Sequence, residues 1–196
     1  IEALHRAGKK IILVNCSGSP IGLEPETQKC EAILQAWYPG QQGGTAVAEV
    51  LFGDYNPAGK LPVTFYRNVS QLPDFEDYNM TGRTYRYMQD APLFPFGYGL
   101  SYTTFDYGKA ALDKGELAAG QSLKLTVPVT NAGKRDGEEV VQVYLRKQGD
   151  AEGPVKTLRA FKRVCIPAGK TVNVEFDLKD KELEWWDDQS NTVRVC

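Results

Sequence analysis

The second half of the chain alternates apolar and polar residues with a period of two, which is typical of β-strands that bury one face. The pattern is clearest in residues 122–130 and 171–178, and similar segments lie at 139–145 and 156–164. Turns that contain glycine or proline separate these segments. Short strands divided by turn signals predict a β-sandwich of the immunoglobulin or fibronectin type III kind.

The first half has a different pattern, in which helices alternate with strands. Residues 11–14 are four consecutive aliphatic residues, as in a parallel strand that is buried on both faces. Residues 32–38 could form a helix or a strand, and their length suits a second parallel strand. We expect helices over 2–8, 25–31 and 45–52, and strands over 11–14, 32–38 and 60–65, the last at a sheet edge because it contains Pro62. This order predicts an α/β domain with a mostly parallel sheet.

An aromatic stretch, residues 93–105, separates the two patterns. Five of its thirteen residues are aromatic, and one proline and two glycines interrupt any regular element. Because a solvated linker is usually polar, we expect a packed joint rather than an aromatic loop within one domain. The predicted fold class is therefore α/β followed by all-β. The α/β part spans 1–91, the inter-domain joint 92–105, and an incomplete β-sandwich 106–196.

Length and charge narrow the function classes. The chain has 196 residues and a net charge of −2, so it lacks the basic footprint of a nucleic-acid-binding protein. No apolar run approaches the roughly 20 residues that a membrane helix needs. Ile1, Leu4 and Ala7 are apolar at helical spacing, so we expect residue 1 to lie already within a helix and the chain to be a piece of a longer protein.

The metal-ligating residue types are too few and too scattered to predict a metal site. The four cysteines are Cys16, Cys30, Cys165 and Cys196, and none forms a Cys-x-x-Cys pair. His5 is the one histidine and cannot complete a zinc site with them. We expect the cysteines to be small buried apolar residues, which leaves the redox compartment open.

Two segments resemble a known family. Residues 36–65, AWYPGQQGGTAVAEVLFGDYNPAGKLPVTF, resemble the C-terminal α/β domain of glycoside hydrolase family 3, which contains β-glucosidases and β-xylosidases. Residues 92–105, PLFPFGYGLSYTTF, are similar to that family's passage into its third domain, which is fibronectin type III-like. Thirty nearly contiguous matching positions make a chance likeness improbable.

The resemblance implies that the intact protein is an exo-acting retaining β-glycosidase, without cofactor, that removes terminal glucosyl or xylosyl units. Such enzymes use two carboxylates about 5–5.5 Å apart. In this family the nucleophile belongs to an N-terminal (β/α)8 barrel, and the acid/base lies upstream of the segment that matches Ile1. We therefore assign no catalytic, substrate-binding or metal-binding residue here, and we expect a scaffold that is inactive alone. Its partners would be the barrel and an oligosaccharide or aryl-glycoside substrate, in the periplasm or outside the cell.

Other side chains with possible chemistry have plainer explanations. The carboxylates nearest to loop tips are Glu24, Glu26, Asp54, Asp74, Glu76 and Asp77. We expect each of them to be a helix start, a turn residue or a solvated side chain. A Gly-x-Ser-x-Gly nucleophile elbow is absent from the sequence. The glycine-rich turn at 40–44 could cradle an anion, but a tight turn before a helix explains it better.

A non-catalytic carbohydrate-binding or adhesion module is the alternative function. It needs an exposed aromatic platform, for which Tyr85, Trp185 and Trp186 are candidates. The two tryptophans should point to opposite faces of an extended segment, one buried and one exposed. Arg83 and Arg86 lie among aromatics and could bind sugar hydroxyls, but we expect them to cement the joint.

Two glycosylation sequons begin at Asn68 and Asn79. They would be used only in a eukaryotic secretory pathway.

Overall fold

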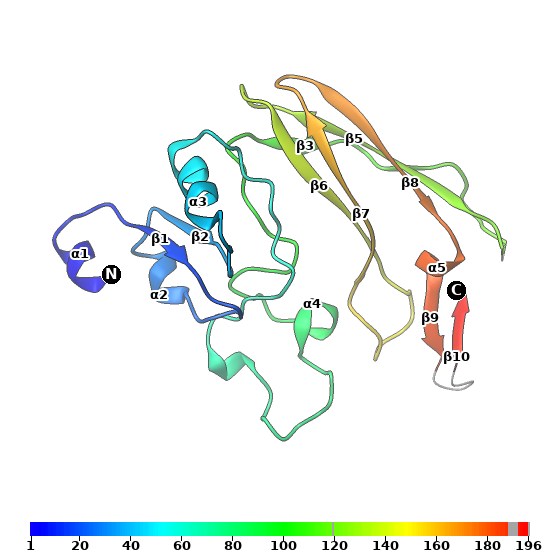
Figure 1. Ribbon diagram of the computed structural model, residues 1–196. Coiled ribbons are helices and arrows are strands. Elements are labelled where there is room, and N and C mark those ends of the chain that lie inside the picture. The colour runs from blue at the N-terminus through cyan, green and yellow to red at the C-terminus, as the bar shows by residue number, and fades with distance from the viewer. Residues whose placement is uncertain (119, 188–191, 196) are drawn as a thin grey trace. The chain divides into compact units, whose positions relative to one another are not determined.

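The computed structural model describes residues 1–118, 120–187 and 192–195 (Figure 1). The chain forms two compact units. Unit 1 contains Ile1–Tyr55 and Lys60–Tyr98, and unit 2 contains Asn56–Gly59 and Gly99–Cys196. The chain therefore passes from one unit to the other three times.

Unit 1 is an α/β segment built on a small parallel sheet. Strands β1 (Ile12–Asn15) and β2 (Ala32–Gln35) pair in parallel, with Ile12 opposite Ala32 and Asn15 opposite Gln35. The helices are α1 (Glu2–Arg6), α2 (Glu24–Thr27), α3 (Gly43–Phe52), α4 (Thr84–Tyr87) and the short 3₁₀ helix η1 (Val69–Gln71). The predicted order of helices and strands is confirmed as far as α3, and residues 32–38 contain a strand rather than a helix.

Helix α3 shows why the local sequence begins and ends a helix where it does. The chain enters it through a turn in which Gly40 has a φ of 68°, and the Gly43 amide donates to the Gly40 carbonyl. Gly53 ends the helix with a φ of 85°, a left-handed value that suits glycine at this position. The helix begins two residues before its predicted start.

Two predictions for unit 1 are wrong. Residues 60–65 are not a strand: Phe65 forms an isolated antiparallel bridge with Phe94, and Leu61 exchanges backbone hydrogen bonds with Gly97 and Tyr98. Pro62 and Pro95 each lack an amide donor, so the ladder between these two segments cannot be continuous. Strand β1 is also not buried on both faces, because Ile12 is exposed and β2 is its one partner among the described strands.

Unit 2 is the predicted β-sandwich. One sheet contains β3 (Phe105–Tyr107), β4 (Ala111–Leu112), β5 (Leu123–Asn131) and β8 (Thr171–Leu178), with β5 at its centre. The other sheet pairs β6 (Gly137–Leu145) with β7 (Thr157–Ile166). Figure 1 shows β5 and β8 side by side along most of their length. The buried core is mostly aliphatic and consists of Val127, Val129, Val141, Val143, Ile166, Val174, Phe176 and Leu178.

The four strands predicted over 122–130, 139–145, 156–164 and 171–178 are confirmed as β5 to β8, whereas β3 and β4 were not predicted. The chain then forms the short helix α5 (Asp180–Leu183) and an antiparallel hairpin of β9 (Glu184–Asp187) and β10 (Thr192–Val195). The extended conformation predicted for the tryptophan segment is thereby confirmed.

Two asparagines tie the turns of unit 2 together. Asn131 is fully buried: its amide nitrogen donates to the carbonyls of Arg135 and Ile166, both at 2.8 Å, and its side-chain oxygen accepts from Thr103 and Gly133. The oxygen of Asn56 accepts hydrogen bonds from the Ser101 hydroxyl and the Tyr102 amide, both at 2.8 Å, and its nitrogen donates to the Asp136 carbonyl at 3.0 Å. Every polar atom of both side chains is thus used.

Aromatic residues of the stretch 93–105 pack within each unit. In unit 1, Phe94 stacks on Tyr98 at 5.4 Å between ring centroids, and Phe96 stacks on Tyr85 at 4.2 Å. In unit 2, Phe105 packs against the sandwich core. These rings are therefore structural, as expected for a proline- and glycine-rich segment that carries many aromatics.

The prediction that the cysteines are buried is wrong for two of them. Cys16 and Cys165 are exposed, and Cys30 is half-buried. Cys165 immediately precedes the buried Ile166 on β7, so the alternation of the strand turns it toward solvent. Cys196 lies outside the described residues.

Candidate functional site

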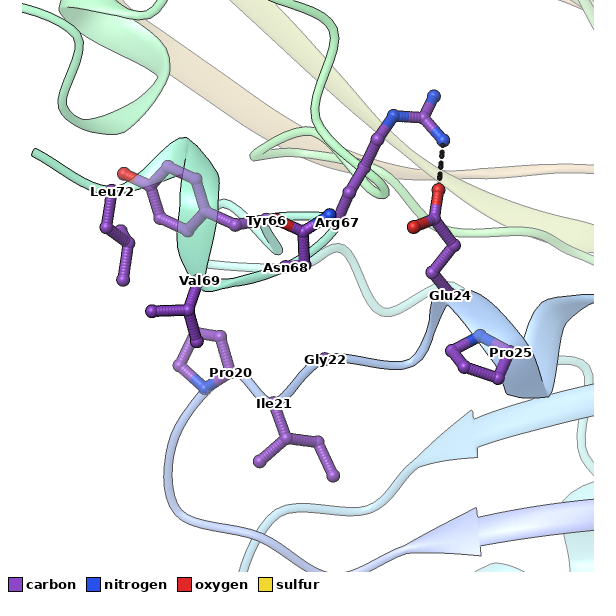
Figure 2. A pocket seen from close by; sticks show the side chains of 10 residues that line it. All are labelled: Pro20, Ile21, Gly22, Glu24, Pro25, Tyr66, Arg67, Asn68, Val69 and Leu72. Carbon is purple, nitrogen blue, oxygen red and sulfur yellow. Dashed lines mark hydrogen bonds and ion pairs between the residues drawn. The ribbon is translucent and has the colours of Figure 1, made fainter.

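A hollow of about 410 Å³ lies in unit 1 between the segment that leads into α2 and the segment around η1. Figure 2 shows aliphatic side chains on one side of it and a charged pair on the other. Its lining residues are Pro20, Ile21, Gly22, Glu24, Pro25, Tyr66, Arg67, Asn68, Val69 and Leu72.

The charged and polar side chains that line the hollow already have partners within unit 1. Arg67 Nη1 lies 3.0 Å from Glu24 Oε1, and its Nε donates to the Ala91 carbonyl at 3.3 Å. The Tyr66 hydroxyl accepts from the Thr84 amide at 2.9 Å. Glu24 is the one carboxylate among the described residues that line the hollow. Glycoside hydrolysis by a retaining mechanism needs two carboxylates, so this hollow alone does not supply that chemistry.

The other predicted carboxylates lie in helices and turns. Asp74 accepts from the Glu76 amide, and Asp77 accepts from the Asn79 amide, both at 2.9 Å, as in Asx turns. The Asn79 backbone and side-chain hydrogen bonds, with a weaker contribution from Arg83, lower the pKa of Asp77. Glu26 lies in α2. Asp54 is exposed and follows Gly53, the residue that ends α3.

Arg83 organises the loop that contains these turns. Its guanidinium donates to the backbone carbonyls of Asn79, Asp74 and Asp77. It is therefore a structural residue, although it holds its own loop rather than the joint between the predicted domains. The loop exposes 95% of Phe75 and 90% of Tyr78, which the sequence did not single out. Arg86 lies 5.6 Å from the centre of the Tyr87 ring.

The three aromatic candidates for a sugar platform differ in exposure. Trp185 is 9% exposed, and the Arg159 guanidinium lies over its ring at 4.6 Å. Trp186 is 56% exposed, so the predicted opposite orientation of the two tryptophans is confirmed. Tyr85 is half-buried against Phe96. Of the three, Trp186 offers an accessible ring.

The two sequons occupy exposed positions in unit 1. The side chain of Asn68 accepts a hydrogen bond from the Ser70 amide and caps η1. The side chain of Asn79 donates to Asp77 at 2.7 Å.

A polar cluster at the carboxyl ends of β1 and β2 was missed by the sequence analysis. Asn15 and Gln35 end the two strands in register, and the Asn15 amide donates to Gln35 at 2.6 Å and to the Ser17 hydroxyl at 2.9 Å. Gln35 in turn donates to the Ser17 carbonyl at 3.2 Å. In open α/β sheets ligands bind beside the carboxyl ends of the strands. A polar residue directly after each aliphatic run was the available signal.

No helix in the part of the chain that the structure describes is both long and apolar enough to cross a membrane. Within the same residues, no group of three or more histidine, cysteine, aspartate or glutamate side chains is placed to hold a metal ion.

The fold defines a two-unit segment, an α/β part followed by a β-sandwich, and comparisons with known proteins identify the family. Residues 1–102 match the glycosyl hydrolase family 3 C-terminal domain, and residues 139–195 match the fibronectin type III-like domain. The chain therefore belongs to glycoside hydrolase family 3, as its sequence motifs indicated.

Individual relatives are glycosidases of much greater length. The chain is 58% identical over 195 residues to a xylan 1,4-β-xylosidase of Xylanibacter ruminicola, covering 100% of this chain and 22% of that protein. It is 41% identical to a periplasmic β-glucosidase of Salmonella typhimurium, covering 96% of this chain and 26% of that protein. A solved β-glucosidase of Erythrobacter marinus superposes with a TM-score of 0.86 at 40% identity, over 100% of this chain and 26% of that one. The chain thus spans about a quarter of the length of these relatives.

Proposed function

We propose that this chain is the C-terminal scaffold of an exo-acting retaining β-glycosidase that releases terminal xylosyl or glucosyl units from oligosaccharides. The observation that carries the proposal is the 58% identity to a xylan 1,4-β-xylosidase across essentially the whole chain. The identity to the periplasmic β-glucosidase is lower, at 41%, which favours xylosyl over glucosyl substrates.

The chain itself would contribute structure rather than chemistry. Its hollow holds one carboxylate, and that carboxylate is paired with Arg67. A retaining mechanism needs two neighbouring carboxylates, and the part of the intact protein upstream of this segment, including an N-terminal barrel domain, would contribute both. In this proposed architecture, the α/β part spans residues 1–91, the joint 92–105 and the sandwich 106–196.

The test compares this chain with the full-length polypeptide that contains it, using p-nitrophenyl β-xyloside and β-glucoside. We expect turnover by the full-length protein, with the xyloside preferred, and none by the chain alone. Xylotriose should release xylose one unit at a time, and the first product should keep the β-configuration by NMR. Turnover by the chain alone, or α-configured product, would refute the proposal.

The proposed location is the periplasm or the outside of the cell, supported by the periplasmic relative of Salmonella typhimurium. Cell fractionation with an antibody against unit 2 tests it, and full-length protein confined to the cytoplasm would contradict it.

A carbohydrate-binding or adhesion module is the second candidate, favoured by the exposure of Trp186. Binding of this chain to a glycan array that is lost in Trp186→Ala, together with inactivity of the full-length protein, would support this function over the first.

A further inference from the structure

Tyr38 is an exposed aromatic residue that the backbone holds in place. It is 79% exposed. A Cβ added to Gly18 would lie 2.5 Å from Tyr38 Cε2 and 2.8 Å from its Cζ and hydroxyl oxygen. The hydroxyl-bearing end of the ring therefore rests against Gly18, so closely that a side chain at position 18 would displace the ring. Most of the ring surface stays open to solvent.

The loops that carry Tyr38 and Gly18 follow two strands that end at the same edge. Because β1 and β2 are parallel and in register, their carboxyl ends lie next to each other. The hydrogen bonds among Asn15, Ser17 and Gln35 join the two chain segments directly before these loops. The start of each loop is therefore held in place by side-chain hydrogen bonds.

The backbone just before Tyr38 is strained. Trp37 has a φ of 54°, a left-handed value that is uncommon for residues other than glycine. Its ring packs edge-on against Phe65, with 6.1 Å between the ring centroids. Strained backbone persists only where surrounding contacts impose it, and it is concentrated at ligand-binding sites.

We propose that Tyr38 is a stacking platform for a pyranose ring of the oligosaccharide substrate. Two arguments point to a sugar: ligands of open α/β sheets bind beside the carboxyl ends of the strands, and the flat apolar face of an aromatic ring fits the C–H face of a pyranose. The amide side chains of Asn15 and Gln35 at the same edge could bind ring hydroxyls. The inference rests on the proposed glycosidase function and extends it by naming a substrate-contacting residue.

Phe75 and Tyr78 are more exposed than Tyr38, but they lie on the Arg83 loop, away from any strand end in the sequence. Tyr78 therefore serves as a matched control. It is an exposed tyrosine of the same unit for which no sugar contact is inferred.

The experiment uses the full-length polypeptide with Tyr38→Ala, Tyr38→Phe or Tyr78→Ala. The probes are thio-linked xylotriose and thio-linked cellotriose, which glycosidases do not cleave, and binding is measured by titration calorimetry. We expect Tyr38→Ala to raise the Kd for one of the trisaccharides about tenfold, the effect of losing one stacked ring. Tyr38→Phe and Tyr78→Ala should stay within twofold of the unsubstituted protein.

The possible outcomes separate this inference from the proposed function. An unchanged Kd in Tyr38→Ala overturns the platform, and so does an absence of binding to either trisaccharide at millimolar concentration. A lowered Tm with unchanged Kd also overturns it, because Tyr38 would then pack against another part of the polypeptide. If the full-length protein cleaves no aryl glycoside but loses trisaccharide affinity in Tyr38→Ala, the proposed function fails and the platform stands.

Discussion

Replacing Asn131 by aspartate tests how much the turn network of unit 2 contributes to stability. The substitution keeps the shape of the side chain but removes the two N–H donors that face the Arg135 and Ile166 carbonyls at 2.8 Å. The oxygen that accepts from Thr103 and Gly133 is retained. The change is therefore confined to one side of a fully buried group.

The expected cost follows from the two carbonyls. Leaving a buried carbonyl unpaired costs about 1–3 kcal/mol, which applies in full to Ile166 and only in part to the half-buried Arg135 carbonyl. The two together cost about 3 kcal/mol, and the negative charge of the carboxylate adds to this. A domain of this size unfolds with about 5–15 kcal/mol, so the loss is a large share of its stability.

The effect should depend on pH. Burial opposite two carbonyl oxygens should raise the pKa of the introduced carboxyl, so the folded state binds its proton more tightly than the unfolded state does. The destabilisation should then be smallest below about pH 4, the unfolded pKa, and should grow as the pH rises through the folded pKa.

The assay is native-state hydrogen exchange of the peptides that cover β5 and β8, with Asn173→Asp as the matched control. Asn173 is an exposed position on β8, where the same substitution should change stability by less than about 0.5 kcal/mol. The reasoning about the buried amide is refuted if, at pH 7, the amides of β5 and β8 are as protected from exchange in the Asn131→Asp variant as in the Asn173→Asp variant.

Three further substitutions test other contacts. Gly137→Ala would place a Cβ 2.7 Å from Thr103 Cγ2, so we expect a loss of about 1–3 kcal/mol in urea unfolding of unit 2, and an unchanged midpoint would contradict the close packing. Burial, and to a lesser extent the hydrogen bond to Glu139, raise the pKa of Tyr107 well above its usual range. The contribution of this tyrosine to folding stability should therefore be complete below about pH 10 and be lost at higher pH. Tyr107→Phe should remove this alkaline loss, and urea midpoints at pH 8 and 11 measure it. Arg83→Lys replaces a fork of donors to three carbonyls by a single ammonium and should speed proteolysis of its loop several-fold; equal cleavage rates would show that the fork is dispensable.

Where the sequence predicted the fold correctly, the signal was long and regular. β5, β6 and β8 alternate over eight or nine residues, so these strands and their buried faces follow from a period of two. β7 was predicted as a β-prone segment between two turns, although its burial does not alternate. β3 and β4, with three and two residues, are too short to show any period. At 60–65 the β-prone residues suggested a strand. The segment that contains Pro62 pairs with one that contains Pro95, and this pairing of two proline-containing segments becomes visible only after the chain has folded.

The candidate site was less accessible to sequence reasoning. The opposite exposure of Trp185 and Trp186 follows from adjacency on an extended strand, so it could be predicted. The fixed exposure of Tyr38 depends on its fit to Gly18, twenty residues earlier, and no local pattern encodes that contact. The half-burial of Tyr85 likewise depends on stacking with Phe96.

The short segment Asn56–Gly59 has a consequence for recombination between family members. It belongs to unit 2, although unit 1 flanks it on both sides in the sequence. A chimera made with one crossover near Tyr98 would inherit Asn56 from one parent and its three partners, Ser101, Tyr102 and Asp136, from the other. Unit 2 is therefore discontinuous in the sequence. A chimera that exchanges the sandwich should also exchange residues 56–59.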